Sequence, residues 1–145
     1  MLDHRWIAAH IPHQGRMCLL DAVLAWNRAG LHARATSHRP TDNPLRADGR
    51  LGAATGIEYA AQAMAVHGVL TAGDGQPLGV GYLASVRAVR LHTDRLDDIA
   101  EDLDVRVQRL SGDAGVILYA FDMSAGGRTL IDGRASVVLD AARLG

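Results

Sequence analysis

The chain has 145 residues, which is the usual size of one domain. Apolar residues make up 48% of it and charged residues 21%, so the chain can bury a core and lacks the composition of a disordered protein. The formal net charge is −1, and every fixed positive charge is an arginine in a sequence without lysine. These arginines are spread along the chain, which argues against a nucleic-acid-binding surface.

Cys18 is the only cysteine, so the chain cannot form an internal disulfide and suits a reducing compartment. The N-terminus lacks the apolar stretch of a signal peptide, and no apolar run approaches the ~18 residues of a membrane helix. We expect a single domain over residues 1–145, located in the cytoplasm.

The first regular element predicted in chain order is a hairpin. Apolar residues dominate residues 17–26, turn formers occupy residues 27–30, and apolar and polar residues alternate over residues 31–37. Residues 39–52 follow, and they hold too many Pro, Asp, Asn and Gly residues for a regular element. This segment is predicted to be a long loop.

A helix is predicted from residue 55 to about residue 70. Five apolar residues recur there at helical spacing: Ile57, Ala60, Ala61, Met64 and Ala65. The many alanines suit a helix that another element approaches closely. Residues 71–77 are turn-rich and end it.

The remainder predicts four strands, over residues 81–92, 103–110, 116–123 and 129–139, with turns at residues 111–113 and 125–127. An antiparallel sheet curled around one long helix buries these elements economically, so the fold class is α+β, of the hot-dog type. The sheet edges and the incompletely covered helix predict a dimer joined through a continuous sheet.

Glu58 places a carboxylate in the first turn of an otherwise apolar helix, with Gln62 four residues later on the same face. An apolar surface disfavours the charged form of a carboxyl group, so Glu58 is a candidate general acid. The alternative is a capping box, in which Glu58 only reaches back to the Thr55 amide.

His13 follows Pro12 and precedes a small-residue turn, in front of the first predicted strand. Imidazole exchanges a proton near neutral pH, so His13 is a candidate general base. A lone loop histidine is more often only a loop residue.

Three motifs together carry a family resemblance. They are Pro-His-x-x-x-Met-x-Leu-Leu-Asp (residues 12–21), Glu-Tyr-Ala-Ala-Gln (residues 58–62) and Gly-Tyr-Leu-Ala-Ser-Val (residues 81–86). The chain resembles the hot-dog 3-hydroxyacyl-[acyl-carrier-protein] dehydratases of the FabZ type and, more closely, the ApeP-like branch of aryl-polyene pathways. The resemblance covers residues 10–139.

In that family a histidine and a glutamate from different subunits dehydrate a 3-hydroxyacyl chain held on a phosphopantetheine arm. The resemblance assigns the glutamate to Glu58 and the following glutamine to Gln62. It implies that amides near Ala54 to Gly56 polarise the thioester carbonyl. It also implies no cofactor, an acyl carrier protein as partner, and a homodimer or a heterodimer with another hot-dog subunit.

The chain departs from the family at the histidine. FabZ-type enzymes carry it in a Gly-His-Phe-Pro-Gly motif before the helix, and residues 42–52 contain no histidine. Three alternatives follow, in this order: His13 takes the role, His38 folds in from the preceding strand, or the subunit is catalytically weak.

The predicted substrate tunnel lies between the helices of two subunits. Its expected lining is Ile57, Ala61, Leu83 and the apolar part of residues 17–20, including Met17. The arginines expected to meet the acidic carrier protein are Arg46, Arg50, Arg87 and Arg90. We expect no metal site, since no histidine has ligands at metal spacing, and the glycines before the helix lack the lysine of a phosphate loop.

The sequence therefore predicts a dehydratase of fatty-acid or aryl-polyene biosynthesis. Two other functions stay open. One is a hot-dog thioesterase that uses the helix carboxylate without His13. The other is a non-catalytic subunit that completes an active partner.

Overall fold

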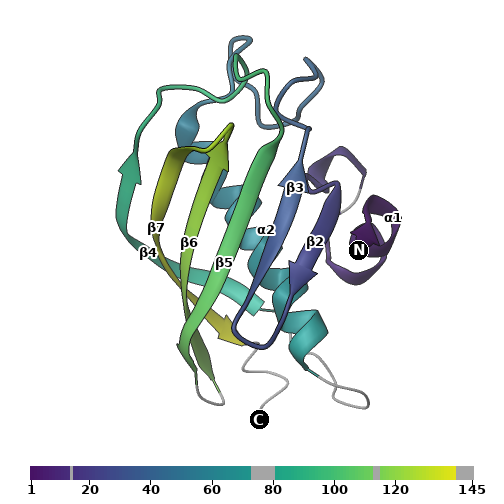
Figure 1. Ribbon diagram of the computed structural model, residues 1–145, viewed down its shortest axis with the longest axis vertical. Helices are drawn as coiled ribbons and strands as arrows, with labels where there is room; N and C mark the ends of the chain where they lie inside the picture. Colours follow the sequence, from purple (N-terminus) through teal and green to yellow (C-terminus); the bar gives the residue numbers. More distant parts are fainter. Residues whose placement is uncertain (14, 73–80, 113–114, 140–145) are drawn as a thin grey trace.

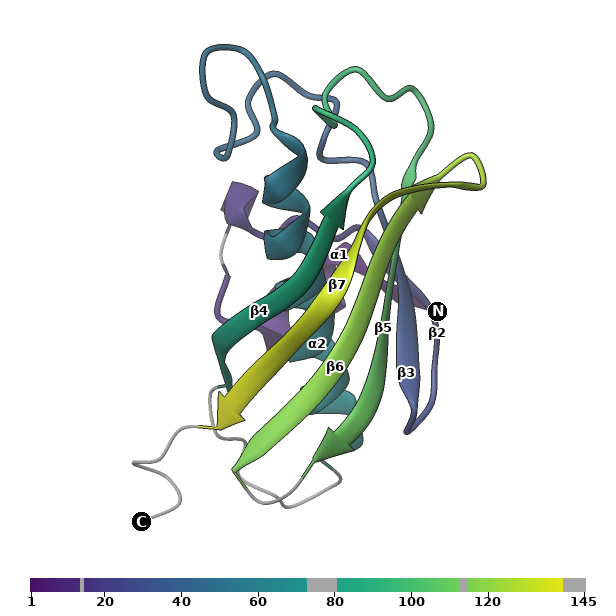
Figure 2. The ribbon, with the colours of Figure 1, turned by 90° about the vertical axis from the view of Figure 1, so that its left-hand side faces the viewer.

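A computed structural model describes residues 1–13, 15–72, 81–112 and 115–139. One seven-stranded antiparallel sheet, in the order β1-β2-β3-β5-β6-β7-β4, carries the long helix α2 on one face (Figures 1 and 2). The strands are β1 (Leu2–Asp3), β2 (Ala22–Trp26), β3 (Gly30–Ala35), β4 (Gly81–Leu91), β5 (Leu103–Gly112), β6 (Val116–Ala125) and β7 (Arg128–Leu139). The helices are α1 (His4–His10) and α2 (Gly56–Thr71), with short 3-10 turns η1 (Gly15–Met17) and η2 (Ala53–Thr55).

The predicted helix and the four strands after it are confirmed. Residues 73–77 of the predicted turn lie outside the described residues, and Thr71 is the last residue of α2. The turn predicted at residues 111–113 was wrong at Ser111 and Gly112, which belong to β5, and residue 113 lies outside the described residues.

The first predicted strand was too long, because residues 17–21 are not part of it. Cys18, Leu19 and Leu20 of that stretch are buried, and the backbone of Met17 and Leu19 bonds to the Gln62 side chain of α2 instead of to a strand.

Apolar side chains at alternate positions along the strands determine which face of the sheet the helix covers. On β5, Leu103, Val105 and Val107 are buried, while Arg106 and Gln108 are exposed on the opposite face. α2 packs chiefly against β3, β5 and β6. Gly56 packs closely on β6 and β7: an added Cβ would lie 2.7 Å from Met123 Cε and 3.1 Å from Ile131 Cγ2. On the edge strand β4 most side chains from Leu83 to Leu91 are exposed.

One polar bridge crosses the core. The fully buried His67 of α2 donates from Nε2 to the Asn27 carbonyl (2.9 Å) and accepts at Nδ1 from the Tyr119 hydroxyl (2.9 Å). Burial lowers the pKa of His67 and raises that of Tyr119 to about 12. Both groups are therefore neutral in the folded chain at neutral pH, because burial disfavours the charged form of a group that has no opposite charge beside it.

Candidate active site

Gln62 joins α2 to the loop that follows His13. Its side chain is fully buried; Oε1 accepts from the Leu19 amide (2.8 Å) and Nε2 donates to the Met17 carbonyl (2.6 Å). Both ends of the amide are thus hydrogen-bonded to backbone groups. Gln62 therefore holds residues 17–19 against the helix.

A second anchor acts on the same loop. The Ser37 hydroxyl donates to the Leu19 carbonyl (2.8 Å) and lies 2.9 Å from the hydroxyl of Tyr59, a buried residue of α2. The Asn43 amide also donates to the Tyr59 hydroxyl (3.2 Å). No motif of the sequence analysis indicated Ser37 or Asn43, because their partners lie far away along the chain.

His13 lies four residues before Met17 and is half-buried. Its Nδ1 is buried and has no hydrogen-bond partner among the described residues. Met17, four residues later, is bonded through its carbonyl to Gln62 of α2, which brings this part of the chain to the helix.

Glu58 lies one turn before Gln62 and is exposed in the single chain. Among the hydrogen bonds of the described residues, none involves its carboxylate. The capping-box alternative was wrong: Thr55 makes no side-chain cap, and its hydroxyl donates instead to the Gly52 carbonyl (2.5 Å). The burial that a general acid requires would have to come from a second chain.

The three amides expected to face the thioester differ in what they bind. The Thr55 amide donates to Gly52 O (3.1 Å), and the Gly56 amide donates to the carbonyls of Ala53 and Ala54. The Ala54 amide donates to no described residue, and Ala54 is exposed. Of these three amides, only that of Ala54 has no acceptor among the described residues.

The expected tunnel residues are open to solvent in the single chain. Met17 is 37% exposed and Leu83 is 38% exposed, while Ile57 and Ala61 are half-buried. Leu83 pairs with Val137 and so points to the face of the sheet that carries α2. Leu83 lies eight residues along β4 from Leu91, which pairs with Ile131 beside the start of α2, so Leu83 and the first turn of α2 lie toward opposite ends of the strand.

His38 cannot reach this surface as it stands. It is fully buried, and its Nε2 donates to the carbonyls of Ile99 and Glu101, both at 3.0 Å. Burial is the main cause that lowers its pKa. His38 supports the loop before α2.

The prediction that Arg46 meets a carrier protein was wrong. Its side chain is only 12% exposed, and its guanidinium donates to the carbonyls of His38, Arg39 and Gly49. Arg50 and Arg87 are exposed, and Arg90 pairs with Asp132 at 3.0 Å.

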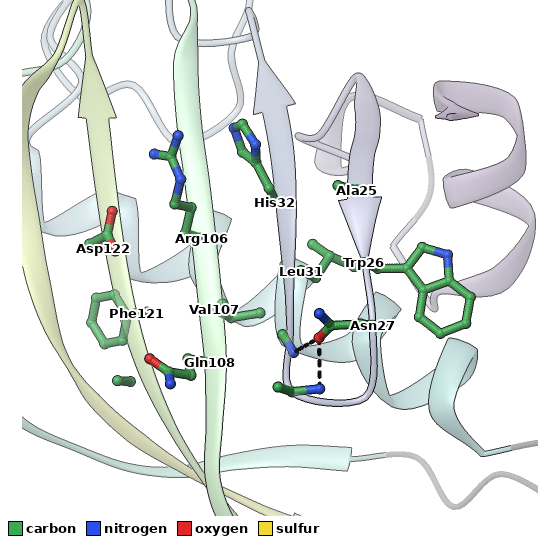
Figure 3. Close-up of a pocket in the computed structure, with 13 residues that line it drawn as sticks. Ala25, Trp26, Asn27, Leu31, His32, Arg106, Val107, Gln108, Phe121 and Asp122 are labelled. Carbon is green, nitrogen blue, oxygen red and sulfur yellow. Dashed lines mark hydrogen bonds between the residues drawn. The ribbon is translucent and has the colours of Figure 1, made fainter.

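A hollow of about 440 Å³ lies on the other face of the sheet, over β2, β3, β5 and β6 (Figure 3). Exposed small residues and Trp26 line it, together with His32, Arg106, Gln108 and Asp122. Neither His13 nor Glu58 belongs to its lining, so it is separate from the candidate site.

Across the described residues there is no group of three or more His, Cys, Asp or Glu residues that could hold a metal ion. No helix within those same stretches has the length and hydropathy of a membrane span.

Comparison with known proteins gives a family and a fold. The ApeP-like family, described as ApeP dehydratase, matches residues 5–143. A chain of the dehydratase heterocomplex ApeI:P from Xenorhabdus doucetiae aligns over 95% of both chains, with 24% identity and a TM-score of 0.80. A thioesterase from Haemophilus influenzae aligns over 95% of this chain and 90% of its own, with 10% identity and a TM-score of 0.66. A mutant thioesterase from Pseudomonas aeruginosa aligns over 83% and 81%, with 12% identity and a TM-score of 0.62. No curated protein matches the chain. The structural likenesses confirm the hot-dog fold.

Proposed function

The chain belongs to the ApeP-like dehydratase family, and on that premise we propose that it dehydrates 3-hydroxyacyl chains carried as thioesters on an acyl carrier protein. The family match confirms the resemblance carried by the three sequence motifs. In the proposed reaction the substrate loses its α-proton and its 3-hydroxyl as water, which leaves a 2,3-unsaturated thioester. The acyl chain belongs to a fatty-acid or aryl-polyene type of biosynthesis.

One observation carries the proposal. Gln62 of α2 binds the backbone of Met17 and Leu19, four to six residues after His13, and Ser37 links Leu19 to Tyr59 of the same helix. Among the described residues, neither His13 Nδ1 nor the Glu58 carboxylate has a hydrogen-bond partner. We assign His13 the removal of the α-proton and Glu58 the protonation of the leaving hydroxyl. Each role would contribute about 10²- to 10⁴-fold to the rate.

The Ala54 amide supports the same assignment. A thioester carbonyl placed against it would be polarised by a fixed donor at the positive end of α2. This polarisation makes the α-proton more acidic when His13 removes it. The neighbouring Gly56 and Ile57 would form the wall at this end of the channel.

A second subunit would complete the channel. β4 is an 11-residue edge strand, and Leu83 on its helix side is exposed. A chain paired along β4 would extend the sheet and cover Leu83, and a partner segment that also removed Glu58 from water would favour a neutral carboxyl. Because the similar X. doucetiae chain comes from a heterocomplex, we propose another hot-dog subunit as the partner, with a second copy of this chain as the alternative.

A non-catalytic role is the second candidate. The loop of residues 39–52 lacks a histidine, and His38, which precedes it, is bonded to two carbonyls in the interior. If His13 performs no proton transfer, this chain would contribute only its sheet edge and channel wall to an active partner.

The test uses purified chain, alone and with a hot-dog partner, and follows the mass of carrier-bound 3-hydroxyacyl and saturated acyl substrates. Loss of one water from the 3-hydroxyacyl substrate supports the dehydratase. Release of free acid from either substrate instead supports a thioesterase.

Variants separate a catalytic chain from an accessory one. With the partner present, Glu58→Gln and His13→Ala should each lower kcat at least ~100-fold. The matched controls are Glu101→Gln, at the only other glutamate, and His10→Ala, at an exposed histidine of α1; neither should change kcat. Unchanged rates in both site variants, in an active complex, would assign catalysis to the partner.

A further inference from the structure

The residues that lead into α2 are held by a segment far along the chain. Residues 51–53 and 94–97 run side by side: the Ala53 amide donates to Asp94 O (3.0 Å) and the Leu96 amide donates to Leu51 O (2.8 Å). A bridge joins Gly52 to Arg95. This contact forms a short ladder between the loop before α2 and the connection from β4 to β5.

One side chain completes the ladder. Asp97 Oδ1 accepts from the Leu51 amide at 2.9 Å. Leu51 is fully buried, so without Asp97 this amide would lack a partner in the interior. No other side chain bonds the backbone of residues 51–53 among the described residues, apart from the local bond of Thr55 to Gly52 O.

The Asp97 carboxylate is itself held on several sides. Its side chain is 6% exposed; Arg95 Nε donates to Oδ1 at 3.0 Å, Arg95 Nη2 contacts Oδ2, and Arg46 Nη1 lies 4.0 Å from Oδ2. Hydrogen bonding to Arg95 holds the pKa of Asp97 well below its usual range. The acceptor is therefore rigid and remains ionised at physiological pH.

From Leu51 to α2 the backbone has little freedom. Gly52 O accepts from the amide and the hydroxyl of Thr55, η2 follows at once, and Gly56 packs against Met123 and Ile131. The Ala54 amide and Glu58 lie within seven residues of Leu51 on this constrained stretch. Any movement of Leu51 is passed on to both groups.

We infer that Asp97 is a positioning residue for the dehydration, which fixes the Ala54 amide and the first turn of α2 relative to the bound thioester. The inference rests on the proposed function. Its physical basis is that a fixed donor is effective only at hydrogen-bond distance from the reacting oxygen, so that a displacement near 1 Å lowers the rate by about 10²-fold. Asp97 touches no substrate and acts only through Leu51.

The test compares Asp97→Ala and Asp97→Asn with Asp98→Asn, at the next residue, whose 60% exposed carboxylate lies 4.0 Å from Arg95. With wild-type activity established in the complex, Asp97→Ala should lower kcat at least ~10-fold with KM within ~3-fold, and Asp98→Asn should change neither. Asp97→Asn keeps an acceptor for Leu51 and should fold with a smaller loss of kcat. Hydrogen exchange at the Leu51 amide should accelerate in Asp97→Ala only.

The outcomes distinguish this inference from the proposed function. A wild-type complex without dehydratase activity refutes the proposed function, and the inference with it. An active wild type whose Asp97 variants keep kcat per folded molecule, and lose only thermal stability, refutes the inference alone. The inference is also wrong if Asp98→Asn lowers kcat as much as the Asp97 variants do, because the loss would then come from removing a negative charge in this region and not from the bond to Leu51.

Discussion

Gln62→Ala tests whether the loop that follows His13 depends on α2. The substitution removes an acceptor at 2.8 Å from the Leu19 amide and a donor at 2.6 Å from the Met17 carbonyl. Leu19 is 1% exposed, so its amide would stay unpaired in the interior, at a cost of about 1–3 kcal/mol. Met17 is 37% exposed, so water can replace the lost donor, and its share is about 1 kcal/mol or less.

We therefore expect Gln62→Ala to lower the free energy of unfolding by about 1–4 kcal/mol, measured by urea denaturation followed by circular dichroism. The matched control is Gln108→Ala, at an exposed position on the opposite face of the sheet, which should stay within about 0.5 kcal/mol of wild type. A loss below about 0.5 kcal/mol for Gln62→Ala would refute the reasoning, because the loop would then be held by other contacts.

The same variant separates a structural Gln62 from a substrate-binding one. If Gln62 acts only through the loop, a loop that loosens misplaces His13, and kcat falls while KM for the carrier-bound substrate changes little. A rise in KM with kcat unchanged would instead show a direct contact with the substrate, contrary to the bonds that occupy both ends of its amide.

Three further predictions concern stability and assembly. Burial lowers the pKa of His38 and His67, so the unfolded chain binds protons at a higher pH than the folded chain does. The free energy of unfolding should therefore be constant above about pH 6.5 and fall below it by up to about 1.4 kcal/mol per pH unit for each histidine. His67→Gln should reduce this slope in a denaturation series between pH 7 and 5. A series without slope would show that the two imidazoles are not buried as neutral groups. Gly56→Ala should destabilise the chain by about 1–2 kcal/mol because its methyl group meets Met123. Gly68→Ala has nothing within 4 Å of the new Cβ and should stabilise the chain by about 0.5–1 kcal/mol. If both variants change the melting temperature in the same direction, this packing is contradicted. Leu83→Arg should weaken assembly with the partner in sedimentation or light scattering, while a variant at the exposed Leu110 of β5, Leu110→Arg, should leave it intact; equal behaviour of the two would place the interface elsewhere.

Local patterns were sufficient for the sheet and the helix. The alternation at Leu103, Val105 and Val107 in β5 predicts one buried face, and the structure buries those residues. The helix α1 was not predicted, because only Ile7 of its seven residues is well buried and no apolar period appears. Its one local signal is Asp3, whose side chain accepts from the Trp6 amide as an N-cap.

The site was predicted only in part, because its supports are long-range. Glu58 and His13 could be singled out by residue type and motif. The partner of Gln62 lies 43 residues away, and that of Asp97 lies 46 residues away, so no periodicity or spacing pairs them. Sequence patterns that report on neighbours within one turn or one strand cannot place such side chains, since their function is set by tertiary packing.

The edge strand β4 is the proposed place for a second subunit. Val86 and Val89 of β4 pack against the core, while Leu83 on the same strand stays exposed. Among the described residues no strand pairs with the outer edge of β4, and such an edge can accept another strand. A single added subunit that paired along β4 would satisfy this edge and cover Leu83. In the single chain the Glu58 carboxyl is exposed to water, whereas enclosure in the assembly would favour its neutral form, which can donate a proton. Dehydration should therefore appear only in the assembly, and full activity in a sample that is monomeric under assay conditions would contradict this account.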